Sequence, residues 1–175
     1  YEGVSQDGEY LGDGDILAFP VIEVFPGPGA EVRYTALHRW GAKARVFSEQ
    51  RMVAARDSAF TGTQVVAGGA VVKAHIVSSL EGRGSSSELY GLGLGTDAQH
   101  IDFYTLQDHI GADTCSNLLF KAALKDRSRS VYYGLTRVGL GARNADANQE
   151  KPNLLLSAEA KADSDPVLEI LTSDI

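Results

Sequence analysis

The sequence is poor in cysteine and has no long hydrophobic run, and each shortage excludes a class of protein. It contains 1 cysteine, Cys115, in 175 residues, so an internal disulfide and a zinc site built from several cysteines are excluded. No apolar stretch approaches the roughly 20 residues of a membrane-spanning helix. No basic segment leads into an apolar one, as a secretory signal peptide requires. We therefore expect no membrane partner and a reducing, cytoplasmic setting.

Positive charge is also scarce, and two common catalytic motifs are missing. The chain carries 16 Lys+Arg against 23 Asp+Glu, a net charge of −7, which repels a polyanion and argues against a nucleic-acid partner. It has no Gly-x-x-x-x-Gly-Lys phosphate loop and no Gly-x-Ser-x-Gly nucleophile elbow. The sequence therefore predicts that the chain does not bind ATP through such a loop and has no serine nucleophile of the elbow type.

Sustained helical periodicity is absent, and short alternating runs take its place. The 19 glycines recur as turn signals beside alanine or serine, about 11 to 18 residues apart, a spacing typical of strands and turns. Apolar residues alternate with others at Leu118, Phe120, Ala122 and Leu124, as in a strand with one buried face. The chain is predicted to be all-β. Either a sandwich or a solenoid of stacked coils fits the length, and the small residues at the corners favour the solenoid slightly.

The densest group of possible metal ligands comprises His100, Asp102, His109 and Cys115, with Asp108 and Asp113 close to them in the sequence. His100 and Asp102 are two residues apart and would share one face of a strand. Nitrogen, oxygen and sulfur ligands together suit iron or zinc. The simpler interpretation is an exposed strand face followed by a polar turn, with an inert thiol at Cys115, and we favour it.

A second chemical hypothesis is a β-helix enzyme that acts on carbohydrate. Its paired carboxylates could come from Asp57, Asp97, Asp102 or Asp126. Such enzymes also need aromatic side chains that stack on sugars, whereas this chain has 1 Trp, Trp40, which we expect to pack at a coil corner. A purely structural β-solenoid is a third hypothesis.

Several segments resemble the core domain of the SufB/SufD family of the SUF iron–sulfur cluster assembly machinery. The resemblance covers nearly the whole chain from residue 34 onward, and as a set these segments are specific. They are residues 34–41 (YTALHRWG), 47–51 (FSEQR), 80–82 (LEG), 89–92 (LYGL), 99–102 (QHID), 106–109 (LQDH) and the block 118–170.

The resemblance implies a fold, a set of partners and a role. It predicts a right-handed parallel β-helix that forms one core domain over residues 1–175. It implies a subunit that is not itself an enzyme and that joins a complex with a SufB-type paralogue and a SufC-type ATPase. Iron or an iron–sulfur cluster is held transiently in that complex, with no cofactor in this chain alone. SufB-type sequences carry a cysteine just before the element at residues 80–82, where this chain has Ser78 and Ser79. A hydroxyl is a poor sulfur acceptor or soft ligand, so the SufD type is favoured.

The two ends of the sequence suggest a piece of a longer protein. It begins at Tyr1 without a methionine and stops before the Cys-Ser-His-Gly segment and the helical region that family members carry. The last apolar strand follows Pro166, and an unpaired strand edge invites pairing with another chain. We therefore expect an interface, or a homodimer of the isolated chain, at Val167, Leu168, Glu169, Ile170 and Leu171.

Overall fold

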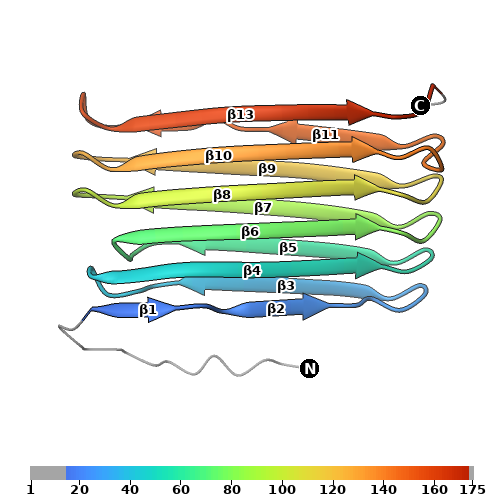
Figure 1. Cartoon of the computed structure of the whole chain (residues 1–175), viewed down its shortest axis with the longest axis horizontal. Helices are drawn as coiled ribbons and strands as arrows, with labels where there is room; N and C mark the ends of the chain where they lie inside the picture. Colours follow the sequence, from blue (N-terminus) through green and yellow to red (C-terminus); the bar gives the residue numbers. More distant parts are fainter. Residues whose placement is uncertain (1–14, 174–175) are drawn as a thin grey trace.

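The computed structural model describes residues 15–173 and shows parallel strands wound into a solenoid with two facing sheets (Figure 1). From β3 to β11, consecutive strands alternate between the two sheets, so each coil contributes one strand to each sheet. Every strand pairing is parallel. The all-β solenoid prediction is confirmed, and the sandwich alternative, which needs antiparallel pairs, is wrong. Nowhere in the described part of the chain is there a helix that could span a membrane.

The seven-stranded sheet has the order β1-β4-β6-β8-β10-β13, and β2 also pairs with β4. Its strands are β1 Ile16–Ala18, β2 Val21–Val24, β4 Ala44–Ala54, β6 Val71–Leu80, β8 His100–His109, β10 Arg129–Val138 and β13 Lys161–Ile170. The six-stranded sheet has the order β11-β9-β7-β5-β3, with β12 also on β9. Its strands are β3 Glu31–His38, β5 Ala59–Val66, β7 Ser86–Gly95, β9 Cys115–Leu124, β11 Asp146–Glu150 and β12 Asn153–Leu155.

The corners of the coils require a left-handed backbone conformation, and short polar residues supply much of it. Asp57, Asp113 and Asn144 have φ of 54°, 57° and 55° between successive strands at one end of the solenoid. Asp97 and Asp126 do the same at the other end, with φ of 52° and 58°. Aspartate and asparagine tolerate this conformation because their side chains hydrogen-bond locally. Three carboxylates considered for carbohydrate chemistry, at positions 57, 97 and 126, are therefore turn residues.

The stacking of one corner on the next explains Gly82. A Cβ atom there would lie 2.1 Å from the backbone nitrogen of Arg56 in the coil below. No side chain fits in that space, so glycine is required at this point of the motif at residues 80–82.

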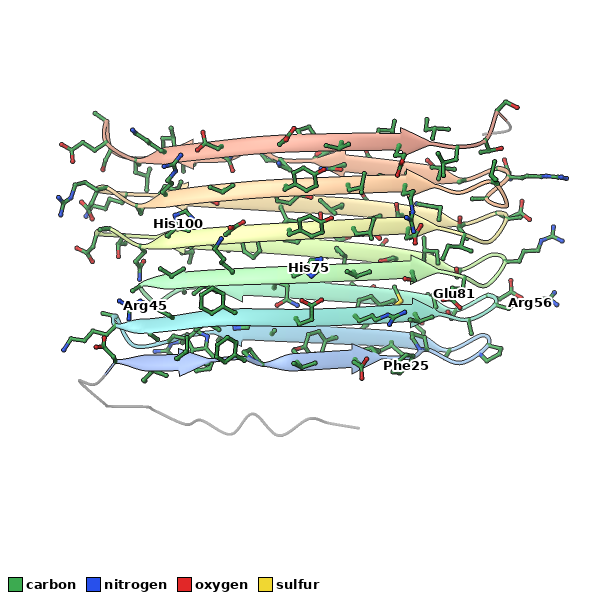
Figure 2. The ribbon with its side chains drawn as sticks, in the orientation of Figure 1. Phe25, Arg45, Arg56, His75, Glu81 and His100 are labelled. Carbon is green, nitrogen blue, oxygen red and sulfur yellow. The ribbon has the colours of Figure 1, made fainter. Side chains whose placement is uncertain are left out.

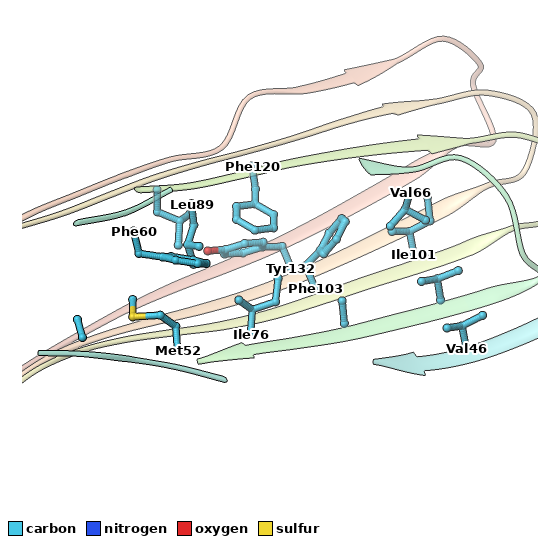
Figure 3. Close-up of a cluster of buried hydrophobic side chains, with 14 of the residues drawn as sticks. Val46, Met52, Phe60, Val66, Ile76, Leu89, Ile101, Phe103, Phe120 and Tyr132 are labelled. Atoms are coloured by element: carbon cyan, nitrogen blue, oxygen red, sulfur yellow. The ribbon is translucent and has the colours of Figure 1, made fainter. Parts of the chain in front are cut away.

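The core lies between the two sheets, where alternate side chains from both sheets interdigitate (Figure 3). Phe120 is 3% exposed, and its ring lies 5.1 Å from that of Phe103 and 5.4 Å from that of Tyr132. The alternation at Leu118, Phe120, Ala122 and Leu124 is confirmed, since all four side chains are buried. Trp40 lies just after β3 and packs against the edge of the same core, as expected of a corner residue.

Candidate functional site

The structure separates the four candidate metal ligands. His100 and His109 are the first and last residues of β8, about 30 Å apart at the usual rise of a strand. His100 and Asp102 are partly exposed on the outer side of β8, His109 is buried, and Cys115 lies on β9 of the other sheet. Within residues 15–173 no group of three or more His, Cys, Asp or Glu side chains could hold a metal ion.

His109 is fully buried, and both of its ring nitrogens have partners. Nδ1 lies 2.8 Å from Thr114 Oγ1, and Nε2 lies 2.8 Å from Ser116 Oγ. The Thr114 hydroxyl donates to the Gly111 carbonyl, so it accepts from Nδ1–H, and Nε2 accepts from Ser116. Burial lowers the pKa of His109, opposed by the charges of Asp108 and Asp146. The ring is therefore neutral near pH 7 and acts as a structural link between β8 and β9.

Asp102 and Asp108 are both engaged in ion pairs. Asp102 lies 2.8 Å from Lys73 Nζ on the outer face of the seven-stranded sheet. Asp108 accepts two hydrogen bonds from the Arg137 guanidinium, one of them 2.9 Å long, and its side chain is almost fully buried. The hydrogen bonds and charge of Asp108 raise the pKa of Arg137. This forked pair stabilises the ends of β8 and β10 against each other.

Cys115 and Ser78 are the two positions where sulfur chemistry could have been located. The Cys115 side chain is exposed at the start of β9, and partial burial, together with the charges of Asp146 and Glu88, raises the pKa of its thiol. A protonated thiol is a poor nucleophile and a poor metal ligand. Ser78 is fully buried and accepts a hydrogen bond of 3.1 Å from Ser87. Neither position presents a thiolate.

A chain of polar groups crosses the interior near the first coils, and sequence analysis missed it. The Trp40 indole N–H donates to Nδ1 of His38 at 3.3 Å, and His38 Nε2 is 3.3 Å from Gln64 Oε1. The chain continues from the Gln64 amide to Gln50, and from Gln50 to Ser48 at 3.2 Å. Along this chain each donated N–H group has an acceptor, so burying these polar groups does not leave a donor without a hydrogen bond.

The candidate interface residues lie at the outer edge of the seven-stranded sheet. β13 pairs with β10 along all of its length, and no described strand pairs with its other edge. Leu168 is 63% exposed and Ile170 is 41% exposed. Pro166 has no N–H to donate, a feature tolerated on edge strands. The free edge extends back to Lys161, so Val167 to Ile170 form only its last part, and Leu171 follows the end of the strand. That these residues form an interface stays a prediction.

The side chains of the last coil leave this end of the molecule apolar. Leu154, Leu155 and Leu156 are each at least half exposed, as is Leu171. In Figure 1 β13 lies at the end of the stack opposite β1 and β2. Those two strands also form an edge of this sheet, but they are 3 and 4 residues long and are interrupted by Pro20. Short strands and proline blunt an edge, so β13 is the better surface for pairing.

Lys151 is the unusual cation at the same end. Its Nζ is buried without a hydrogen-bond partner and lies 3.3 Å from the centroid of the Tyr132 ring. Burial lowers the pKa of Lys151 to about 8, although the charge of Asp165 acts in the other direction. The contact with the ring is a cation–π interaction that replaces part of the lost hydration.

Comparisons with known proteins point to one family. A family model described as "SUF system FeS cluster assembly, SufBD core domain" matches residues 3–175. The chain is similar to the iron–sulfur cluster assembly SufBD family protein ycf24 of Pyropia yezoensis, with 26% identity over 90% of this chain and 34% of the relative. It is 28% identical to the chloroplastic SufBD family protein ABCI8 of Arabidopsis thaliana, over 90% of this chain and 30% of that protein.

A SufBD family protein of Mycobacterium bovis is 34% identical, over 69% of this chain and 32% of its own length. The chain thus spans about a third of the length of these curated relatives. The matches agree with the resemblance that the sequence motifs carry.

Proposed function

The chain belongs to the SufBD core-domain family of the SUF iron–sulfur cluster assembly system, and from that premise we propose that it is the core of a SufD-type platform subunit. In this role it pairs with a SufB-type paralogue while a SufC-type ATPase is recruited by the longer protein. The platform performs no chemistry of its own. Iron or the nascent cluster passes through the complex as cargo, in a cytoplasmic setting.

The observation that carries the proposal is the free edge of β13. Ten residues of this strand are paired in register with β10 on one side. No strand in the described part of the chain lies along its other edge. Pairing of a partner strand with residues 167–171 would satisfy the backbone groups that this edge exposes. It would also bury the exposed leucine side chains near this edge, and exposed apolar side chains that lie together are typical of a surface that binds a partner.

Two further observations support the SufD type and the absence of a catalytic role. SufB-type sequences carry a cysteine in the segment where this chain has Ser78 and Ser79. In the structure Ser78 is buried and its hydroxyl is hydrogen-bonded to that of Ser87. The raised pKa of Cys115 argues against a thiolate ligand or sulfur acceptor on this chain. Both favour a partner that holds the cargo while this subunit supplies a surface.

The experiment is co-purification of the longer protein with its SufB-type and SufC-type partners. We expect all three to elute together, and the chain of residues 1–175 alone to carry no stoichiometric iron or zinc. Metal analysis of the His109→Ala and Cys115→Ser variants serves as the control. Metal bound in near-stoichiometric amount and lost in either variant would replace the platform role with a metal site. Elution of the longer protein alone would leave the carbohydrate enzyme and the structural solenoid as the remaining hypotheses.

A further inference from the structure

A row of rings crosses the outer face of the seven-stranded sheet. Glu49, His75, Tyr104, Tyr133 and Asp165 occupy the same register position on β4, β6, β8, β10 and β13. Figure 2 shows His75 near the middle of β6, in the centre of this face. We call these five residues the acid–aromatic ladder, because three aromatic rings lie between two carboxylates.

The rings of the ladder are held by one another. The His75 and Tyr104 rings meet edge to face with centroids 4.5 Å apart, and the Tyr104 and Tyr133 rings stack at 5.1 Å and 11°. His75 Nδ1 lies 2.8 Å from a Glu49 carboxylate oxygen. Side chains that are already ordered by their neighbours lose little further freedom when they bind a ligand. The ladder is therefore pre-organised for binding, and its three rings are not part of the hydrophobic core between the sheets.

Four members of the ladder, all except Asp165, line a groove rather than a flat surface. Other residues that line the groove include Phe19, Val21, Phe47, Lys73, Asp102 and Val131. Phe19 and Phe47 stack at 5.7 Å and are 64% and 38% exposed. Exposed aromatic side chains gathered in a concavity are typical of a surface that binds a partner.

Most of the charged side chains named in and beside the groove are paired, and Asp165 is the exception. Lys73 is already paired with Asp102 at 2.8 Å, and Arg129 with Asp163 at 2.7 Å. Glu49 forms its ion pair within the described residues with the His75 ring. Asp165 takes part in no ion pair within the described residues, although its charge acts through space on Lys151. The row of rings therefore has a carboxylate at each end: Glu49, which lines the groove and meets the His75 ring, and Asp165 on β13, which has no ion pair among the described residues.

We propose that the acid–aromatic ladder binds an extended, cationic segment of a partner protein. Four spacings between neighbouring strands separate Glu49 from Asp165, about 19 Å. An extended peptide covers that distance in about six residues, so the segment carries two arginine or lysine side chains at about that separation. Its cations pair with the two carboxylates and lie against the tyrosine rings, which attract them electrostatically. One end of the ladder, Asp165, lies on β13, the strand whose free edge the proposed SufB-type pairing uses, whereas His75 and Tyr104 lie farther into the sheet on β6 and β8.

A fluorescence-polarisation titration with designed peptides tests the proposal. The probe is a labelled peptide of about nine residues with two arginines about six positions apart, as the strand spacing requires. Two control peptides have the same composition with adjacent arginines, or glutamate in place of each arginine. We expect the first peptide to bind most tightly. The Asp165→Asn and Tyr104→Ser variants should each weaken it by about threefold to tenfold, as expected for a single exposed cation contact.

Tyr90→Ser is the matched control variant, because Tyr90 lies beside Glu88 on the outer side of the other sheet, with its hydroxyl 3.2 Å from that carboxylate. It should leave binding unchanged, and circular dichroism should show that all variants keep the fold. Equal affinity for both arginine spacings, an equal loss in Tyr90→Ser, or no binding of any arginine peptide would each overturn the proposal. None of these outcomes depends on whether the SufB-type partner binds.

Discussion

At the scale of single residues, the interior of the solenoid combines aromatic rings with hydrogen-bonded polar groups. Phe120 is central to the apolar part, because it contacts rings from both neighbouring strands of the facing sheet. Gly91, beside it on β7, is required by the same ring: a Cβ there would lie 2.0 Å from Phe120 Cδ1. A side chain so closely surrounded leaves a cavity when it is shortened.

We therefore expect Phe120→Ala to lower the free energy of unfolding by about 3–5 kcal/mol, as aromatic truncations in cores do. Lys121, the next residue, is exposed, and Lys121→Ala should change the free energy by less than about 0.5 kcal/mol. Urea denaturation of both variants measures the difference. Equal losses would mean that the faces of β9 are assigned the wrong way round.

His109 gives a prediction for pH dependence. Burial lowers its pKa in the folded state, so the unfolded chain takes up a proton more readily below about pH 6.5. Stability that is complete above pH 6.5 should therefore fall as the pH decreases, by up to about 1.4 kcal/mol per pH unit for this group. His38, whose pKa is also lowered by burial, acts in the same direction.

The His109→Gln variant isolates this contribution, because an amide can hydrogen-bond to Thr114 and Ser116 but does not take up a proton. Its free energy of unfolding should depend less steeply on pH between pH 6.5 and 5 than that of the wild type. Identical slopes in the two proteins, measured by denaturation at each pH, would show that His109 is not held neutral by its surroundings.

At the scale of the secondary-structure elements, β13 differs from the strands inside the sheet because, among the described strands, only β10 pairs with it, along one edge. Lysine on an edge strand hinders pairing with another chain. We expect the isolated chain to form a homodimer through this edge, and Ile170→Lys to raise the dissociation constant of that dimer at least about tenfold. Sedimentation equilibrium of the wild type and the variant measures the two dissociation constants. Leu94→Lys is the control, since Leu94 is exposed on β7, a strand paired on both sides. A similar effect of both lysines would exclude edge pairing as the cause.

The elements also show which features the sequence could predict. The alternation from Leu118 to Leu124 predicted the buried face of β9, because it depends on neighbouring residues in the chain. The start of β13 was not predicted, since this strand begins at Lys161 and runs through Pro166. The ladder of His75, Tyr104 and Tyr133 was missed because its members are 29 residues apart, a spacing also seen for the Asp108–Arg137 pair. A search for repeats of that length would have found it. The partners of His109 and Gln64 could not be predicted, since they depend on which side chains meet across the two sheets.

At the scale of the whole molecule, each coil is stabilised by the coils on either side, as in other solenoids. The described residues contain strands and no helix. The far-ultraviolet circular dichroism spectrum of the chain should therefore be β-rich, with little helical signal. A spectrum with more than about a third helix, an ordinary fraction for mixed globular proteins, would contradict the fold.

The central proposal is that the β13 edge of this SufBD-family solenoid is a pairing surface, and it is tested most directly by the affinity for a SufB-type partner. Isothermal titration of the longer protein with the SufB-type paralogue should give a specific complex. Ile170→Lys should weaken that complex at least about tenfold, a loss of about 1.4 kcal/mol, and Leu94→Lys should leave it unchanged. Full affinity in the Ile170→Lys variant would contradict the account, because the partner would then bind elsewhere on the molecule.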